Sequence, residues 1–381
     1  MLCKTALLIA ILSAVTIASN AQQSAEKLWR FAVSGDSRNC GDVVMPAIAK
    51  SARAHEIAFY WHLGDFRVGY AVDEDMQDRA GGKLLLEEYY RTVWDDFISN
   101  QMTPFGSVKI HLGIGNHELY LHGNTKDDQN LSHTEFVTKF NKWLGGSNTA
   151  YYRWKEKQID FINLDNSFNE GFDDKQMEWL EWVLKEDRAD DTVRAIVVGM
   201  HRALPNSLAC GHSMNGDSST SAEDNAKSLR SGRLVYEYLW NFQNTTGKHV
   251  YVLASHSHLY MQDIFNTNYW NYRNEKDRAV LGDKGIRQRT LDGWLIGTAG
   301  AVRYRLPEGL LANTLAITYA YGYLLGTVNA DGTIAFEFQQ VTENDVPPDA
   351  ASAFHKTFVD ACFLANRDDS THTPEPSCAE R

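Results

Sequence analysis

The sequence predicts an α/β protein with a buried, mixed sheet, and two observations support this fold class. Short apolar runs that end in glycine or in an acidic residue alternate with amphipathic helical patterns, which is typical of strand–helix units around a covered sheet. The segment Asn329-Ala330-Asp331-Gly332 separates two further strand patterns, and Asp-Gly readily supplies the positive φ values of a tight hairpin turn. Because a hairpin joins antiparallel strands, the sheet is expected to contain both strand orientations.

The expected elements follow one another along most of the chain. The apolar runs predict strands at Leu28–Ser34, Ile57–Leu63, Val108–Ile114, Ile159–Leu164, Ala195–Met200, His249–Ala254, Trp294–Gly297, Tyr323–Val328 and Thr333–Gln339. Helices are expected between them at Val43–Ala54, Leu84–Ile98, His133–Trp143, Lys175–Lys185 and Leu234–Gln243. In the helix from Lys175, an apolar face is flanked by charged residues, which predicts packing against a core rather than a cofactor site.

Composition limits the classes of partner. The chain has 381 residues, of which 43% are hydrophobic, so it can bury a large core. Acidic residues number 49 against 37 lysines and arginines, a net charge of −12, and the sequence contains no basic run. Duplex nucleic acid and anionic membranes are therefore not expected partners. A phosphate substrate is still compatible with this charge, because bound divalent cations can invert the local charge of a site.

The two ends of the chain are expected to lie outside the folded domain. Residues 1–21 are predicted to be a signal peptide, because Lys4 precedes an apolar stretch and small residues end at Ala21, after which cleavage and export to the periplasm or the medium are expected. No later stretch offers about 20 consecutive apolar residues, so stable membrane insertion is not expected. Residues 342–381, rich in proline, acids, serine and threonine, are expected to form a loosely packed tail.

Polar residues follow the predicted strands at the points where those strands end, which is where layered α/β sheets bind ligands. These residues are Asp36, Asp65, Asn116, His117, Glu118, His201, His256 and His258. Carboxylates, an amide oxygen and imidazoles form the ligand set that zinc, manganese and iron accept. Two metals that lie about 3.5–4 Å apart need a bridging carboxylate, and Asp65 is the natural candidate.

The order of these blocks resembles a known signature. Gly-Asp, then Gly-Asn-His-Glu, then a histidine after an apolar strand, then His-x-His is similar to the calcineurin-like metallophosphoesterases, across residues 28–341. The segments 160–167, 176–180 and 201–205 further resemble purple-acid-phosphatase-like members. The resemblance implies a four-layer α/β/β/α sandwich over residues 28–341, in which helices flank two mixed sheets. It also implies an enzyme that hydrolyses a small phosphorylated substrate, a phosphomonoester.

The resemblance also implies a ligand set and a mechanism. Two divalent or trivalent metal ions, which would be Fe, Zn or Mn, are expected. The first would be held by Asp36, Asp65 and His258, and the second by Asp65, Asn116, His201 and His256. A hydroxide that bridges the metals would attack phosphorus, and His117 would protonate the leaving oxygen. Glu118 is expected to orient His117 or its loop.

Two positions depart from the pattern. Arg38 stands where the family usually has a histidine ligand, and Val68 stands where purple acid phosphatases supply a tyrosine, with Tyr70 the nearest one. The first metal is therefore one protein ligand short, which a water, Asn39 or Tyr70 could replace. Arg38 cannot be a ligand because its guanidinium offers only donors. Its planar fork suits a phosphate, so Arg38 is expected to clamp the substrate.

Export would place the remaining cysteines in an oxidising compartment. They are Cys40, Cys210, Cys362 and Cys378, and three pairings are possible. The favoured prediction pairs Cys40 with Cys210, since each follows a ligand segment, and Cys362 with Cys378. Unpaired cysteines are the alternative.

Other functions stay open. A phosphodiesterase or nucleotidase would use the same residues, and a non-catalytic protein with a degraded metal site would keep the fold and bind a phosphorylated or carbohydrate ligand. Metal content separates the last of these from the enzymes. The sequence makes no prediction of the oligomeric state.

Overall fold

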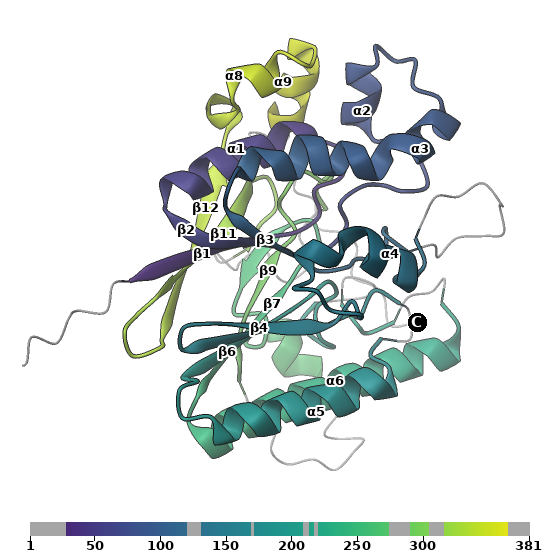
Figure 1. Ribbon diagram of the computed structural model, residues 1–381. Helices are drawn as coiled ribbons and strands as arrows, with labels where there is room; N and C mark the ends of the chain where they lie inside the picture. The colour runs from purple at the N-terminus through teal and green to yellow at the C-terminus, as the bar shows by residue number, and fades with distance from the viewer. Residues whose placement is uncertain are drawn as a thin grey trace, which may run out of the picture.

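The computed structural model describes residues 28–119, 131–168, 171–208, 213–216, 220–273, 290–304 and 316–364. The predicted signal peptide lies outside these residues. Within them, the strands form a five-stranded and a seven-stranded sheet, stacked between two helical layers (Figure 1). The expectation of an α/β/β/α sandwich with two mixed sheets is confirmed.

The first sheet has the strand order β12-β11-β1-β2-β3. Its strands are β1 (Trp29–Ser34), β2 (Ile57–His62), β3 (Lys109–Leu112), β11 (Tyr321–Val328) and β12 (Ile334–Val341). Strands β1, β2 and β3 are parallel, whereas β11 is antiparallel to β1 and forms the expected hairpin with β12. Its helices are α1 (Gly41–Ala54), α2 (Glu74–Arg79) and α3 (Leu86–Phe97), the last continuing into the turns Ile98–Met102 and Thr103–Phe105.

The second sheet has the order β10-β8-β9-β7-β6-β5-β4. Its strands are β4 (Tyr152–Glu156), β5 (Ile159–Asn163), β6 (Ala195–Met200), β7 (His249–Ala254), β8 (Tyr260–Gln262), β9 (Asp292–Ile296) and β10 (Ala316–Ile317). The central strands β5, β6, β7 and β9 are parallel. Helices α5 (Asp174–Ala189) and α6 (Ala222–Thr246) cover its outer face, and α4 (His133–Phe140) lies beside the sandwich (Figure 1).

Aromatic rings join the two sheets. Phe31 on β1 and Phe59 on β2 both meet Phe161 on β5 edge to face, with ring centroids 5.0 and 4.9 Å apart. Trp61 of β2 also packs edge to face on Trp154 of β4, at 4.9 Å. Such contacts contribute beyond the burial of their apolar area. They fix one sheet against the other, so the loops at the ends of both sheets keep a constant relative position.

The elements that the sequence did not predict are mostly short or polar. The strands are β4, β8 and β10, and the helices are α2, α8 (Pro348–Ala351) and α9 (Lys356–Leu364). Helix α6 also begins earlier than expected, at Ala222, because Ser221 caps a polar first turn by accepting a hydrogen bond from the Asp224 N–H. A hydrophobic pattern cannot mark this part of the helix.

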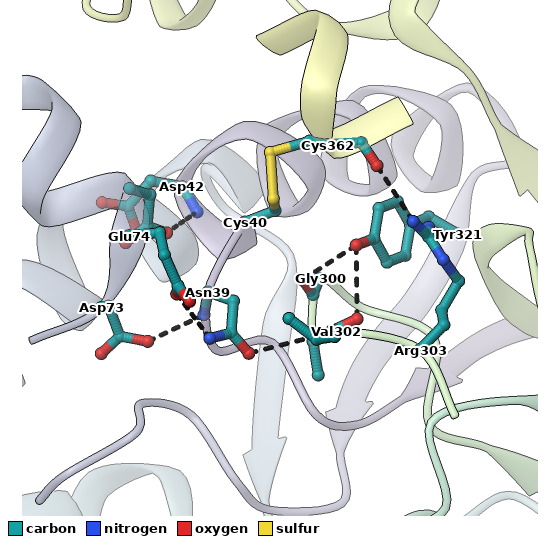
Figure 2. The surroundings of a disulfide bond; sticks show 12 residues. Asn39, Cys40, Asp42, Asp73, Glu74, Gly300, Val302, Arg303, Tyr321 and Cys362 are labelled. Atoms are coloured by element: carbon teal, nitrogen blue, oxygen red, sulfur yellow. Dashed lines mark hydrogen bonds between the residues drawn. A yellow bond between two sulfur atoms is a disulfide. The ribbon is translucent and has the colours of Figure 1, made fainter. Parts of the chain in front are cut away.

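The predicted disulfide pairing is wrong. Cys40 is bonded to Cys362, not to Cys210, as Figure 2 shows. Cys40 immediately precedes α1, and α9 lies over the same end of the first sheet, so the two sulfurs meet although 322 positions separate them in the sequence. Cys210 and Cys378 lie outside the described residues.

The tail is better packed than expected as far as Leu364. Val359, Cys362 and Phe363 of α9 are all buried. The prediction of a loosely packed tail was therefore wrong for this part, because the proline and acidic residues before α9 obscured its apolar face. Residues 365–381 lie outside the described part of the chain. Among the described helices, none is both long and apolar enough to cross a membrane.

A buried ionic cluster ties the helices α1, α2 and α3 together. Arg67 is fully buried and forms ion pairs with Asp42, Asp75 and Asp96. Arg79 joins the cluster through Asp42 and Asp96. Buried charges are tolerated only when they are paired and hydrogen-bonded. Because Arg67 lies two positions after Asp65, the cluster also anchors the loop that follows β2.

Replacement of Arg67 with Met should lower the free energy of unfolding by about 3–5 kcal/mol, because the buried carboxylate of Asp75 loses its cationic partner and Asp42 and Asp96 keep only Arg79. Urea unfolding followed by circular dichroism measures this change. Lys139→Ala, which breaks the exposed pair with Asp95, is the control and should cost less than about 1 kcal/mol. A similar small loss for both variants would contradict the role of the cluster.

Candidate metal centre

The predicted site residues converge where the strands of both sheets end. Asp36 follows β1, Asp65 follows β2, and His201 follows β6. The segment Asn116–Glu118 follows β3, and the segment His256–His258 follows β7. Parallel strands carry their carboxyl ends to the same edge of a sheet, so the two sheets together bring all of these loops to one place.

Three of these residues have a left-handed backbone. The φ angles are 61° for Asp36, 60° for Asp65 and 67° for His256. Such conformations are rare in residues other than glycine and cost on the order of 1–3 kcal/mol each. Each sharp turn redirects the chain at the end of a strand. Three of the residues that the sequence singled out therefore carry backbone strain.

The residues form two groups that share Asp65. In the first group, which corresponds to the second expected metal, the ligand atoms of Asp65, His201 and His256 all lie within 4.8 Å of one another. In the second group, which corresponds to the first expected metal, the same holds for Asp36, Asp65 and His258. These are the groupings that the resemblance implies, and a shared carboxylate is what a pair of neighbouring metals requires.

In the first group, which Asn116 completes, the acceptor atoms of the side chains face one another. His201 Nδ1 lies 2.9 Å from the carbonyl oxygen of Leu63, so the N–H of this ring is fixed there. His201 Nε2 then points at Asn116 Oδ1, 3.0 Å away, and at Asp65 Oδ1, 3.3 Å away. His256 Nδ1 lies 3.1 Å from the same nitrogen. When the His201 ring is neutral these atoms are all acceptors, so they need either a proton on Nε2 or a metal ion between them.

The pKa of His201 also indicates that this position favours a positive charge. Burial lowers the pKa of His201, but the carboxylate of Asp65 outweighs this effect and raises the pKa to about 9. A proton therefore supplies the missing positive charge when no metal is bound. A divalent cation would satisfy the same lone pairs with a larger charge.

The second group has two carboxylate oxygens without a hydrogen-bond donor. Among the described residues, Asp36 Oδ1 and Asp65 Oδ2 are buried and accept no hydrogen bond. The other oxygens do, Asp36 Oδ2 from the His256 N–H at 2.7 Å and Asp65 Oδ1 from the His117 N–H at 3.0 Å. His258 donates from Nδ1 to the carbonyl of Val302, and its Nε2 lies 3.5 Å from Asp36 Oδ1. Buried anionic oxygens of this kind need a positive charge beside them, which a metal ion or a guanidinium can supply.

Arg38 reaches into the second group. Its Nη2 lies 3.0 Å from His258 Nε2 and its Nη1 contacts His117 Nε2. Only 9% of the residue is exposed. Burial lowers the pKa of Arg38, but Asp65 and then Tyr304 and Asp36 outweigh it, so the pKa is raised and the guanidinium stays charged. The side chain thus lies within the centre and not at its rim.

His117 and Glu118 have separate roles. His117 Nδ1 lies 2.6 Å from the carbonyl of Val68, which leaves Nε2 to face the centre. Glu118 is fully buried and accepts from the N–H groups of Asp65, Phe66 and Gly115, at 2.9, 2.6 and 2.6 Å. It therefore holds the Asp65 loop and its own loop in place, while the His117 ring is oriented by the carbonyl of Val68.

The two side chains suggested as substitutes for the missing ligand have other partners in this structure. Asn39 donates to Glu74 and accepts from the Val302 N–H, and Tyr70 is half exposed with its ring 5.3 Å from that of His117. Sequence reasoning missed Tyr304, whose ring stacks on His258 at 4.0 Å and whose hydroxyl lies 3.4 Å from Arg38 Nη2. Tyr304 belongs to none of the sequence blocks, so no sequence signal could have found it.

A cavity of about 780 Å³ lies beside α4 and the start of α5, and its lining includes none of the metal-ligating residues named above. It is lined by residues of α4, of the segment before β4, of the loop after β5 and of the start of α5, including His133, Tyr151, Asp165, Phe168 and Gln176. Asn166, next to Asp165, exchanges two hydrogen bonds with the backbone of Arg202, at 2.6 and 2.9 Å. Since Arg202 follows His201, the cavity wall and the metal centre are joined through adjacent residues.

Comparisons of the sequence with family models and with curated proteins give no match. The structure, in contrast, is similar to solved phosphatases. A purple acid phosphatase from yellow lupin (Lupinus luteus) seeds superposes with a TM-score of 0.54 and 14% identity, over 93% of this chain and 57% of that one. PhoD superposes with a TM-score of 0.52 and 12% identity, over 83% and 72%. The chain thus spans little more than half the length of the lupin protein.

Identities this low establish the architecture only. The superpositions extend over 93% and 83% of this chain, so they include both stacked sheets. The chain therefore has the fold of the calcineurin-like metallophosphoesterases.

Proposed function

We propose that this protein is a metal-dependent phosphoesterase that hydrolyses a small phosphomonoester. The observation that carries the proposal is the carboxylate of Asp65, which is shared by two groups of metal-ligating side chains. The phosphatases of the same fold support this reaction class. Bound metals would supply a nucleophile derived from water at neutral pH and would neutralise charge on the phosphate.

The side chains of the centre would each act on one part of the substrate. The guanidinium of Arg38 presents N–H donors, which suit a pair of phosphate oxygens. His117 lies beside Arg38 and faces the centre through Nε2. Burial lowers its pKa to about 4, and a bound phosphate dianion would raise this value again. The ring could then carry the proton that the leaving oxygen needs.

The cavity beside α4 and α5, whose wall is joined to the residue after His201 through Asn166, is the place where we propose that the organic part of a small substrate binds. Its volume of about 780 Å³ falls within the range of sites that bind small molecules. The rings of His133 and Phe168, which are tilted by 49° with centroids 4.4 Å apart, and the carboxylate of Asp165 offer both apolar and polar contacts. The group esterified to phosphate would lie there.

Turnover of nitrophenyl phosphate should be lost on chelation and restored by Zn, Mn or Fe. Asp65→Asn should lower kcat at least about 100-fold, because both groups lose their shared ligand. Asp95→Asn, which changes an exposed carboxylate on α3, is the control and should leave turnover unchanged. Full turnover after chelation would exclude the proposal, and a protein that binds metal without turnover would be the non-catalytic alternative.

His117→Ala should affect substrates according to their leaving group. With an alkyl phosphate, kcat should fall about 10²–10⁴-fold, since the departing alkoxide needs a proton. With nitrophenyl phosphate, whose leaving group is stable as an anion, the loss should be far smaller. Steady-state kinetics on both substrates measures the difference, and equal losses would count against the role of His117 as the acid.

We further propose that the protein works outside the cytoplasm. The disulfide between Cys40 and Cys362 supports an oxidising compartment. The exported protein should begin at Gln22, which N-terminal sequencing would test. An intact N-terminus on protein recovered from the cytoplasm would contradict export.

A further inference from the structure

Arg38 uses the lone pair that a metal at the second group would need. His258 donates from Nδ1 to the carbonyl of Val302, so the neutral ring has its lone pair on Nε2. That nitrogen lies 3.0 Å from Arg38 Nη2, which donates to it. Among the residues that the structure describes, the other members of this group are the carboxylates of Asp36 and Asp65. A metal there would have to displace the guanidinium from His258.

The charges in the buried centre also disfavour a metal at the second group. Asp36 and Asp65 are the carboxylates whose oxygens lie in the two groups, and Arg38 already balances one of them. One divalent cation bound to Asp65, Asn116, His201 and His256 would more than balance the other. A second divalent cation would then lie against a buried guanidinium, and like charges at such distances repel strongly when water is excluded.

Several contacts hold Arg38 in this position. The ring of Tyr304 stacks on His258, and its hydroxyl lies near Arg38 Nη2. On the backbone side, the Cys40 N–H donates to the carbonyl of Gly300 at 3.1 Å, and the Val302 N–H donates to Asn39 Oδ1 at 3.2 Å. The residues that follow Arg38 are therefore bonded to the loop that carries Tyr304.

The disulfide adds a second tie to this loop (Figure 2). Cys40 is bonded to Cys362, and Arg303 donates to the carbonyl of Cys362 at 3.3 Å. The guanidinium of Arg303 also stacks on Tyr321, whose hydroxyl donates to Gly300 and Ala301. The position of Arg38 thus results from a connected set of contacts between α1, the 300–304 loop and α9.

We propose that Arg38 takes the place of one of the two metals. The protein binds one metal tightly, at Asp65, Asn116, His201 and His256, while the guanidinium fills the other position beside Asp36 and His258. In catalysis, which rests on the function proposed above, Arg38 then supplies to the phosphate the positive charge that a second metal would supply. The proposal concerns metal binding first, so it can be tested without turnover.

The test is the metal stoichiometry of the full-length mature protein. Protein stripped with a chelator is titrated with Zn²⁺ in a calorimeter, and its zinc content after dialysis is measured by elemental analysis. The wild type should hold one tight equivalent. Arg38→His, which replaces the guanidinium with an imidazole, should hold two, with a gain of at least about 100-fold in the affinity of the second. Two equally tight equivalents in the wild type, unchanged by Arg38→His, would overturn the proposal.

Further variants identify which group of side chains binds the tight zinc ion. His256→Ala should lose it, whereas His258→Ala should retain it in the wild-type background. The reverse result would overturn the assignment. Arg38→Met removes the charge without adding a ligand, and it should also raise the affinity for a second zinc ion. This variant keeps the proposal testable if Arg38→His does not fold. Arg53→Met, which removes an exposed arginine in the last turn of α1, is the control and should keep the single tight equivalent.

The outcome is independent of the proposed reaction. A chain that holds one tight zinc and gains a second on Arg38→His, yet hydrolyses no phosphate ester, would retain the metal inference and exclude the function. A wild type with two tight metals and chelator-sensitive hydrolysis would retain the function and exclude the inference.

Discussion

The buried carboxylate of Asp65 is the point on which the rest of the centre depends. One of its oxygens accepts from the His117 N–H and lies 3.3 Å from His201, while the other is buried without a donor among the described residues. Glu118 holds the peptide that carries it, and its left-handed backbone turns it toward both groups of ligands. An unsatisfied buried anion is costly, so the structure around it must supply a positive charge. His201, Arg38 and a metal ion are the groups able to do so.

The fold brings these charged side chains together. Aromatic contacts lock the two sheets to each other, and the strands of both sheets end at the same edge. On the other side of the Asp65 loop, the Arg67 cluster fixes the helices that cover the first sheet. The centre is thus built from loops that start on rigid elements, which lets strained residues keep their conformation.

Much of this arrangement could be predicted from the sequence. Strands that end in Gly-Asp or Gly-Asn-His-Glu can be recognised by local pattern alone, and parallel strands of one sheet must deliver such residues to one edge. The groupings around Asp65 followed from resemblance. The pairing of Cys40 with Cys362 could not be predicted, because it depends on where α9 packs after a chain reversal that no local pattern encodes. Tyr304 was missed for the same reason. Arg38 was identified as unusual, but only the structure places its guanidinium against His258.

The most direct test of this account is a crystal structure of the protein grown with Zn²⁺, with anomalous diffraction recorded at the zinc edge. The account predicts a strong anomalous peak in contact with Asp65, Asn116, His201 and His256. An anomalous map without a peak at Asp65, or with zinc bound only elsewhere on the protein, would contradict it.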